Sequence, residues 1–254
     1  MRTRRIGFGL ACIGLIGLAA SAGAQEGEPR ELVAAVLEAI PKNSFVSKLT
    51  LSSDAFAPRE IQMSRKYVDG AHGSYLEVVA PDELEGIRFL FLERPNGEHE
   101  QYIKVKASRQ AVRVQEGVRT QPFLGSTFYV SDLVLPQIDD FTYKYVGKDV
   151  LDGRSVTLVE MTPKDPATSV YGKTVLALDP KDKLILRREF FDKNGEKVKV
   201  WTIDKIEQID GIWTLSGQEM RDLKANRKSR LDVSDVKYNS ELPDMMFTPK
   251  YLLR

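Results

Sequence analysis

The sequence predicts a mainly β protein built on one long antiparallel meander, and three observations predict it. Segments rich in β-branched and aromatic residues follow one another from residue 45 to residue 238. Many of them alternate apolar and polar residues, which is typical of a strand with one buried face. Dipeptides that supply positive φ to two-residue hairpins separate several of them: Asp69-Gly70, Asn96-Gly97, Asp152-Gly153, Asn194-Gly195 and Asp210-Gly211.

The chain begins with the features of a secretory signal peptide. Three arginines among the first five residues precede an uncharged apolar stretch from Ile6 to Ala20, and Ala22-Gly23-Ala24 is the small-residue pattern behind which signal peptidase cleaves. We expect residues 1–24 to be removed after Ala24 and residues 25–254 to fold as a single domain in the periplasm. Arg4-Arg5 would also suit twin-arginine export, but Gly7 stands where that signal usually has a bulky apolar residue, which favours Sec export.

Composition and missing motifs argue against several classes of function. Cleavage would remove the only cysteine, Cys12, and three of the 37 basic residues but none of the 36 acidic ones. The slightly negative mature chain would lack a thiolate metal site and the charge expected of a nucleic-acid partner. His72 and His99 lack a second ligand at metal-binding spacing, and there is no serine-nucleophile elbow or phosphate loop. We expect a non-enzymatic monomer with no catalytic residue, metal or cofactor.

One amphipathic helix is predicted before the first strand. Leu32, Val36 and Ile40 recur at every fourth position and give the helix one apolar stripe. Pro29 suits a first helical turn and Pro41 cannot continue the helix. The sequence therefore predicts a helix over residues 29–40.

The strands follow in order, with one interruption. We predict them at 45–56, 60–68, 74–80, 86–93, 100–106, 110–115, 141–149, 154–162, 170–178, 183–192, 197–208, 212–222 and 229–238. The segment from Ile87 to Leu92 is apolar on both faces apart from Arg88, which predicts cover on both sides of the sheet. Between residues 125 and 138 the alternation stops, and we expect a short helix there, capped by Ser131 with Asp132 near its N-terminus.

A sheet of this size must twist and tends to curl, so its inner face has to be filled. Two outcomes are open from the pattern alone. Either the sheet closes tightly on its own side chains, or part of the inner face is a ligand cavity.

Five segments, taken in order, resemble a known family. They are Ala80-Pro81-Asp82-Glu83-Leu84-Glu85-Gly86-Ile87-Arg88-Phe89-Leu90, Phe123-Leu124-Gly125-Ser126-Thr127-Phe128-Tyr129-Val130-Ser131-Asp132-Leu133, Leu186-Arg187-Arg188-Glu189-Phe190-Phe191-Asp192-Lys193-Asn194-Gly195, Ile209-Asp210-Gly211-Ile212-Trp213 and Leu242-Pro243-Asp244-Met245-Met246-Phe247-Thr248-Pro249. Their order and spacing are similar to the LolA-like outer-membrane lipoprotein-sorting protein family, in its larger, mostly uncharacterised branch. Gln101-Tyr102-Ile103-Lys104-Val105-Lys106 stands where the family often has a Trp-x-Tyr-x-Pro stretch, which leaves the ligand open.

The resemblance implies a curled antiparallel half-barrel, LolA/LolB-like, with the N-terminal helix and a short mid-chain helical lid over an apolar concave face. Relatives bind lipoprotein acyl chains there. The resemblance thus implies a non-catalytic periplasmic carrier of lipid or lipoprotein acyl chains in outer-membrane lipid or lipoprotein trafficking, whose protein partner would be an inner-membrane transporter or an outer-membrane acceptor. An envelope sensor or transporter-associated adaptor with the same fold is the alternative, and a hydrolase with an unrecognised site is a third.

The resemblance also implies roles for particular residues, with plain core packing as the alternative for each. The expected cavity walls are Phe89, Phe91, Tyr143, Phe190, Trp201 and Trp213, and the expected lid contacts are Leu32, Val36, Ile40, Phe128 and Leu133. Arg65 alternates with Met63 and Tyr67, which points it toward the apolar side. It is the expected latch that hydrogen-bonds to the lid, unless it lies at a strand end facing solvent.

Overall fold

The computed structural model describes residues 28–94, 98–114 and 120–254. The predicted signal peptide and the predicted Asn96-Gly97 turn lie outside these residues.

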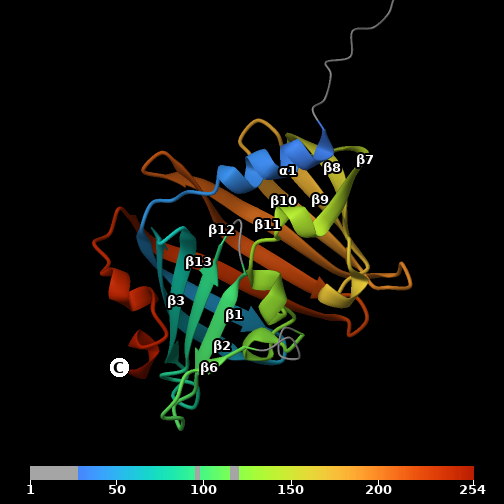
Figure 1. The fold of residues 1–254 in the computed structure, drawn as a ribbon. Helices are drawn as coiled ribbons and strands as arrows, with labels where there is room; N and C mark the ends of the chain where they lie inside the picture. The colour runs from blue at the N-terminus through green and yellow to red at the C-terminus, as the bar shows by residue number, and fades with distance from the viewer. Residues whose placement is uncertain (1–27, 95–97, 115–119) are drawn as a thin grey trace, which may run out of the picture.

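One antiparallel sheet of thirteen strands makes up most of the described chain (Figure 1). The strands are β1 (Phe45–Ser53), β2 (Phe56–Val68), β3 (Ala71–Ala80), β4 (Arg88–Glu93), β5 (Glu100–Lys104), β6 (Val112–Arg113), β7 (Phe141–Leu151), β8 (Arg154–Pro163), β9 (Lys173–Asp179), β10 (Leu184–Phe191), β11 (Lys197–Ile209), β12 (Ile212–Asp222) and β13 (Arg227–Tyr238). Each of them overlaps one of the segments predicted above, so the mainly antiparallel β prediction is confirmed.

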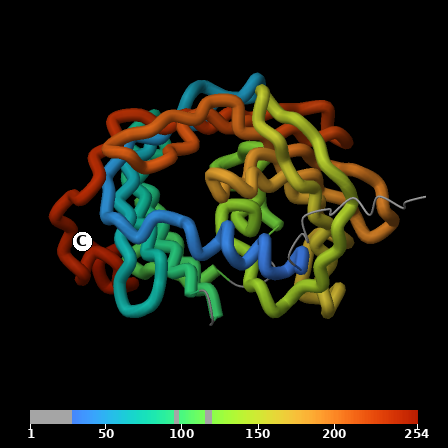
Figure 2. The backbone as a smooth tube through the Cα atoms, turned by 90° about the horizontal axis from the view of Figure 1, so that it is seen from above, coloured from blue at the N-terminus to red at the C-terminus, as the bar shows by residue number. Residues whose placement is uncertain are grey.

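The strands do not follow a single meander, because β1 pairs with β13. The order is β6-β5-β4-β3-β2-β1-β13-β12-β11-β10-β9-β8-β7, so the first and last strands pair in the middle of the sheet. This divides the sheet into an N-terminal arm, β1–β6, and a C-terminal arm, β7–β13. Figure 2 shows the two arms bent toward each other as an arch. Because β6 and β7 lie at opposite edges, the sheet is an open half-barrel, and the chain between them has to cross the concave side.

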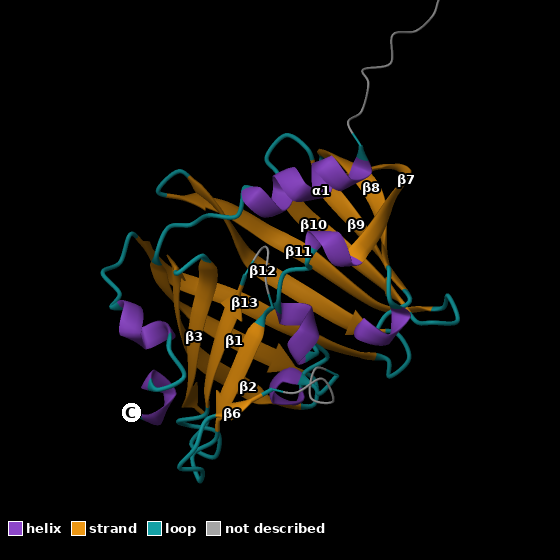
Figure 3. Ribbon diagram, viewed as in Figure 1, coloured by secondary structure: helices purple, strands orange, loops and turns teal. Residues whose placement is uncertain are grey.

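We call the described part of this crossing, residues 120–140, the strap. It contains three short 3₁₀ turns, η2 (Phe123–Gly125), η3 (Val130–Leu133) and η4 (Ile138–Asp140), seen within the arch in Figure 3. The predicted Ser131 cap is wrong. Tyr129 is the N-cap of η3, and the Asp132 carboxylate accepts a hydrogen bond from its backbone N–H at 2.8 Å. Asp132 does stabilise the N-terminus, as expected for an acidic residue in a first turn.

The predicted helix is α1 (Pro29–Glu38), which spans the open side of the arch (Figure 2). Pro29 lies in its first turn, and Val33 and Val36 are buried against the interior. At the surface Arg30 pairs with Asp139 of η4 at 2.5 Å. Within the residues that the structure describes, no helix is long and apolar enough to cross a bilayer.

The predicted turns form where the local chemistry demands them. Asp69-Gly70, Asp152-Gly153 and Asp210-Gly211 have positive φ at both residues, as a type I′ hairpin requires. At Asn194-Gly195 only the glycine has positive φ. There the Asp192 carboxylate instead accepts hydrogen bonds from the N–H groups of Asn194 and Glu196.

Both faces of β4 are covered, as its sequence predicts. Phe89 and Phe91 belong to the large core cluster on the concave side, whereas Leu90 and Leu92 belong to a separate cluster on the convex side. The convex cluster is completed by the C-terminal turns η6 (Asp244–Phe247) and η7 (Tyr251–Leu253). Gly73 of β3 permits this contact, because a Cβ there would lie 2.8 Å from the Phe247 ring.

Candidate functional site

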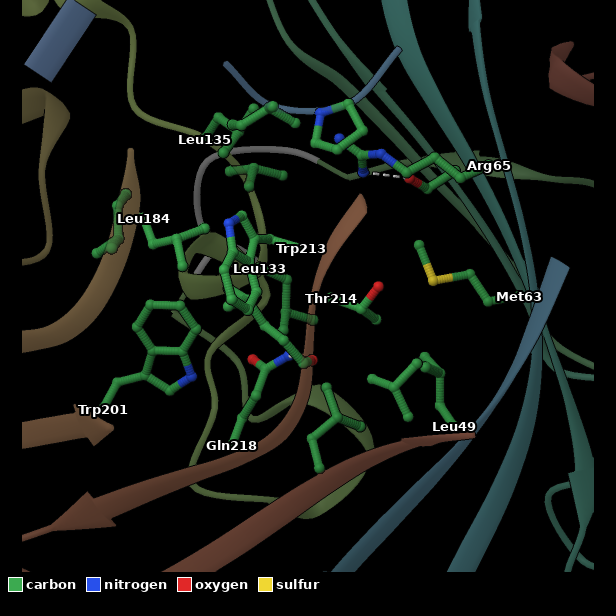
Figure 4. Close-up of a pocket in the computed structure, with 18 of the residues that line it drawn as sticks. Leu49, Met63, Arg65, Leu133, Leu135, Leu184, Trp201, Trp213, Thr214 and Gln218 are labelled. Atoms are coloured by element: carbon green, nitrogen blue, oxygen red, sulfur yellow. Dashed lines mark hydrogen bonds between the residues drawn. The ribbon is translucent and has the colours of Figure 1, made fainter. Parts of the chain in front are cut away.

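A cavity of about 550 Å³ lies between the concave face, α1 and the strap. This volume is within the range of pockets that enclose small-molecule ligands. Figure 4 shows Leu184 and Trp201 of the C-terminal arm on one side of the cavity and Leu49 and Met63 of the N-terminal arm on the other. The sheet therefore keeps a mostly apolar hollow that its own side chains do not fill.

Most of the predicted cavity and lid residues line this hollow. They are Phe91, Phe190, Trp201 and Trp213 from the sheet, Val36 from α1, Ile40 from the turn that follows α1, and Phe128 and Leu133 from the strap. Three predicted residues lie elsewhere. Phe89 is buried behind the lining against Phe123, with ring centroids 5.0 Å apart. Leu32 packs partly buried against the core, and the Tyr143 hydroxyl donates to the Ile138 carbonyl at 2.9 Å.

Arg65 points into the apolar side, as its alternation predicts, and lines the cavity (Figure 4). Its guanidinium donates to Ser74 Oγ at 2.7 Å and to the Glu93 carboxylate at 2.9 Å. Glu93, only 3% exposed, accepts a further hydrogen bond from the backbone N–H of Leu135 at 2.8 Å. In the part of the chain that the structure describes, Arg65 is therefore linked to the strap indirectly, because Glu93 bonds to both Arg65 and the Leu135 N–H.

Leu135 is held at its carbonyl as well. His99 Nδ1 accepts from the Arg94 N–H at 3.1 Å, so His99 Nε2 carries the proton that it donates to the Leu135 carbonyl, 2.8 Å away. Both backbone groups of Leu135 are thus bonded to side chains of the N-terminal arm or its loops. This end of the strap is fixed to that arm.

The part of the strap just before Leu135 is fixed to the C-terminal arm by Asp132. The Tyr171 hydroxyl donates to its carboxylate at 2.8 Å, and Lys199 Nζ lies 3.3 Å away. Lys199 also donates to the Thr127 carbonyl at 2.7 Å and lies over the Tyr129 ring. The side chains of Lys199 and Asp132 are 3% and 2% exposed, and burial lowers the pKa of Lys199.

A second, more polar cavity of about 410 Å³ adjoins the first. Arg188 of β10 lines both cavities, and its guanidinium lies over the Trp201 ring, 4.3 Å from the centroid. Burial lowers the pKa of Arg188 to about 10. Arg188 therefore keeps its charge at neutral pH.

Arg65 and Asp132 are predicted above, but two further cations of this site, Lys199 and Arg188, are not. Lys199 shares a strand face with Trp201 and Ile203, and Arg188 shares one with Phe190. A cation among apolar residues on one face of a strand is the signal that could have identified Lys199. Among the described residues no group of three or more His, Cys, Asp or Glu side chains could hold a metal ion.

Solved structures with this fold are similar over nearly their whole length. A domain assigned as an outer membrane lipoprotein-sorting protein from Vibrio parahaemolyticus has a TM-score of 0.82 at 21% identity, covering 89% of this chain and 98% of that one. A DUF1329 family protein from Desulfovibrio piger has a TM-score of 0.80 at 20% identity, covering 88% and 97%. A LolA superfamily protein from Nitrosomonas europaea has a TM-score of 0.66 at 21% identity, covering 88% and 98%.

Sequence comparison gives a family but no characterised relative. No curated protein matches the chain. A family model described as "Uncharacterized protein" matches residues 70–254, which is more than half of the chain. The chain therefore belongs to the uncharacterised family that this model describes, and its fold is that of the LolA-like outer-membrane lipoprotein-sorting proteins.

Proposed function

We propose that this protein is a non-catalytic periplasmic carrier that binds the acyl chains of a lipid or lipoprotein in the larger cavity, within outer-membrane lipid or lipoprotein trafficking. The observation that carries the proposal is the unfilled apolar hollow between the two arms, with its lining of aliphatic and aromatic side chains. Transferring an acyl chain from water into such a hollow gains about 0.8 kcal/mol per buried CH₂.

A carrier also has to release its ligand, and α1 is suited to that task. Its described contacts with the rest of the chain are mainly apolar, through Val33 and Val36, with one exposed ion pair to Asp139. Val36 also lines the cavity, so α1 and an acyl chain would compete for the same surface. In this proposal α1 moves aside to admit the ligand while the strap stays in place.

Native mass spectrometry of protein exported to the periplasm tests the proposal. We expect the wild type to carry acyl lipid and to have the mass of a chain that begins at Gln25. Met63→Trp adds bulk inside the cavity and should reduce the lipid adduct. Gln62→Trp is the matched control, because Gln62 is exposed on the same strand, and it should retain the adduct.

Two outcomes would contradict the proposal. One is a wild-type protein that carries no lipid after export and takes up none from vesicles that contain acylated lipoprotein. The other is a Met63→Trp variant that binds as much lipid as the wild type, since the ligand would then lie outside the cavity.

A further inference from the structure

The smaller cavity and its boundary with the larger one hold two polar groups that have no hydrogen-bond partner in the described fold. Arg188 Nε and Ser131 Oγ are both buried, and neither has a hydrogen-bond partner among the described residues. Both side chains line the smaller cavity, and Arg188 also lines the larger one. A buried donor without a partner costs free energy, so two of them at one place require an explanation.

The acidic residues near Arg188 are already bonded to other groups. Asp132 is held by Lys199 and Tyr171, and Glu93 is held by Arg65 and the Leu135 N–H. Arg188 itself makes one long hydrogen bond, 3.5 Å, to the Asp132 carbonyl, and forms no ion pair within the described residues.

Arg188 therefore has no carboxylate of its own among the described residues. Arg65 pairs with Glu93, and Lys199 pairs with Asp132 and also lies near the negative charge of Asp222. An uncompensated charge is costly in a buried, low-dielectric site, and one bound anion would balance it.

We propose that Arg188 and Ser131 form the head-group site of the ligand: they bind a singly charged anionic group, a carboxylate or a phosphodiester, whose acyl chain occupies the larger cavity. This rests on the proposed function, because it requires an acyl chain in the apolar hollow. Arg188 lines both cavities, so a chain in the larger one can present its polar end to the guanidinium, and Ser131 lies beside it in the smaller cavity. The guanidinium fork suits carboxylate and phosphate oxygens.

The test compares one acyl probe with and without its charge. The fluorescent fatty acid cis-parinaric acid and its uncharged methyl ester are titrated into the mature protein. Hydrogen bonds to a charged group make the expected difference about tenfold or more in Kd, in favour of the acid. Arg188→Gln should remove this preference by weakening the acid alone, Arg188→Lys should restore part of it, and Ser131→Ala should reduce it.

The matched control is Arg187→Gln. Arg187 is the next residue on β10, but it pairs with Asp149 and Glu189 and does not line either cavity. We expect this variant to keep the full preference for the acid. Arg188→Gln should also be at least as stable to urea as the wild type, because it removes a buried charge that has no ion-pair partner.

Displacement of the bound acid identifies the head group. Oleate and 1-oleoyl-lysophosphatidylglycerol present a carboxylate and a phosphodiester on one chain, and monoolein is the uncharged equivalent. Stronger displacement by either anionic lipid than by monoolein supports the inference and names the anion.

The outcomes separate this inference from the proposed function. Equal affinity for acid and ester in the wild type would overturn the head-group site but leave an acyl carrier. An Arg188→Gln variant that loses affinity for both probes together with its stability would also overturn it, because Arg188 would then be structural. Failure of the wild type to bind either probe would contradict the proposed function itself.

Discussion

At the scale of single residues, the strap is fixed by buried charge. Asp132 accepts hydrogen bonds from the Tyr129 N–H and the Tyr171 hydroxyl and pairs with Lys199. Val130 and Leu133, on either side of it, belong to the apolar core cluster or pack against it. A buried pair of this kind adds little over an apolar replacement of both partners, but removing one partner leaves the other charge uncompensated.

Lys199→Met should therefore destabilise the protein strongly. We expect a loss of about 3–5 kcal/mol in the free energy of unfolding, because the Asp132 carboxylate would stay buried without its cation. Urea unfolding followed by tryptophan fluorescence measures the change. Lys197→Met is the control on the same strand. The Lys197 side chain is exposed, so its ion pair with Glu189 should contribute at most about 1 kcal/mol to the free energy of unfolding. Equal losses in both variants would contradict the importance of the buried pair.

His72 makes the stability depend on pH. It is 4% exposed, and burial, helped by the positive charges of Arg65 and Lys42 and opposed by Glu93, lowers its pKa from 6.5 to about 4. Between pH 6.5 and pH 4 the unfolded chain therefore binds a proton at His72 that the folded protein does not bind. The folded protein is fully stable in this respect above pH 6.5, and it loses at most about 3 kcal/mol in its free energy of unfolding as the pH falls toward 4.

His72→Phe should remove this part of the pH dependence. The variant keeps an aromatic ring against Tyr67, whose centroid lies 4.9 Å from that of His72. Urea midpoints measured from pH 7.5 to pH 4.5 should fall less steeply in the variant than in the wild type. Parallel curves would show that His72 does not titrate differently in the folded and unfolded states.

Residue positions on a strand were predictable when the strand pattern was regular. Arg65 lines the cavity because its alternation with Met63 and Tyr67 points it toward the apolar side. Arg188 is harder to place, because a bulge between Ile185 and Arg187 changes which residues of β10 face inward. The pairing of Lys199 with Asp132 joins residues 67 positions apart, and no local pattern contains such a contact.

At the scale of elements, the strands, their turns and α1 were predictable because each depends on neighbouring residues. Periods of two and of about four residues identify the strands and the helix, and Asp-Gly dipeptides identify type I′ turns. The crossing of the strap was not predictable, since it follows from β6 and β7 lying at opposite edges. The predicted mid-chain helix is instead a series of 3₁₀ turns bonded to both arms.

The two covers of the cavity should differ in their dynamics. Backbone groups of Thr127, Tyr129 and Leu135 in the strap are bonded to side chains of other elements or to Asp132. The helix α1 depends on apolar contacts and an exposed ion pair. We expect amides of residues 32–38 to exchange with deuterium faster than those of residues 127–135.

Hydrogen exchange with and without oleate measures this difference. Oleate should further increase exchange in α1, because the helix is displaced from the cavity, and leave the strap unchanged. Residues of β2 give the internal reference. A strap that exchanges as fast as α1, or an α1 that oleate protects, would contradict the assignment of α1 as the moving cover.

At the scale of the whole molecule, the two arms share one core. The large concave cluster includes Leu49 and Ile61 of the N-terminal arm and Leu176 and Met220 of the C-terminal arm. The β1–β13 pairing joins the arms at the middle of the sheet, and the strap is bonded to both. An open half-barrel without such cross-links would have two hinged halves.

We therefore expect the arms to unfold in one cooperative transition. Trp201 and Trp213 report on the C-terminal arm. Because the only cysteine, Cys12, lies in the predicted signal peptide, Gln62→Cys in the mature chain allows a single fluorescent label on the N-terminal arm. Tryptophan fluorescence, the label and far-ultraviolet circular dichroism should give the same urea midpoint. If the label reported an earlier transition than the tryptophans, the shared core and the strap would not couple the arms, and a ligand between them would be held by two independently folding halves.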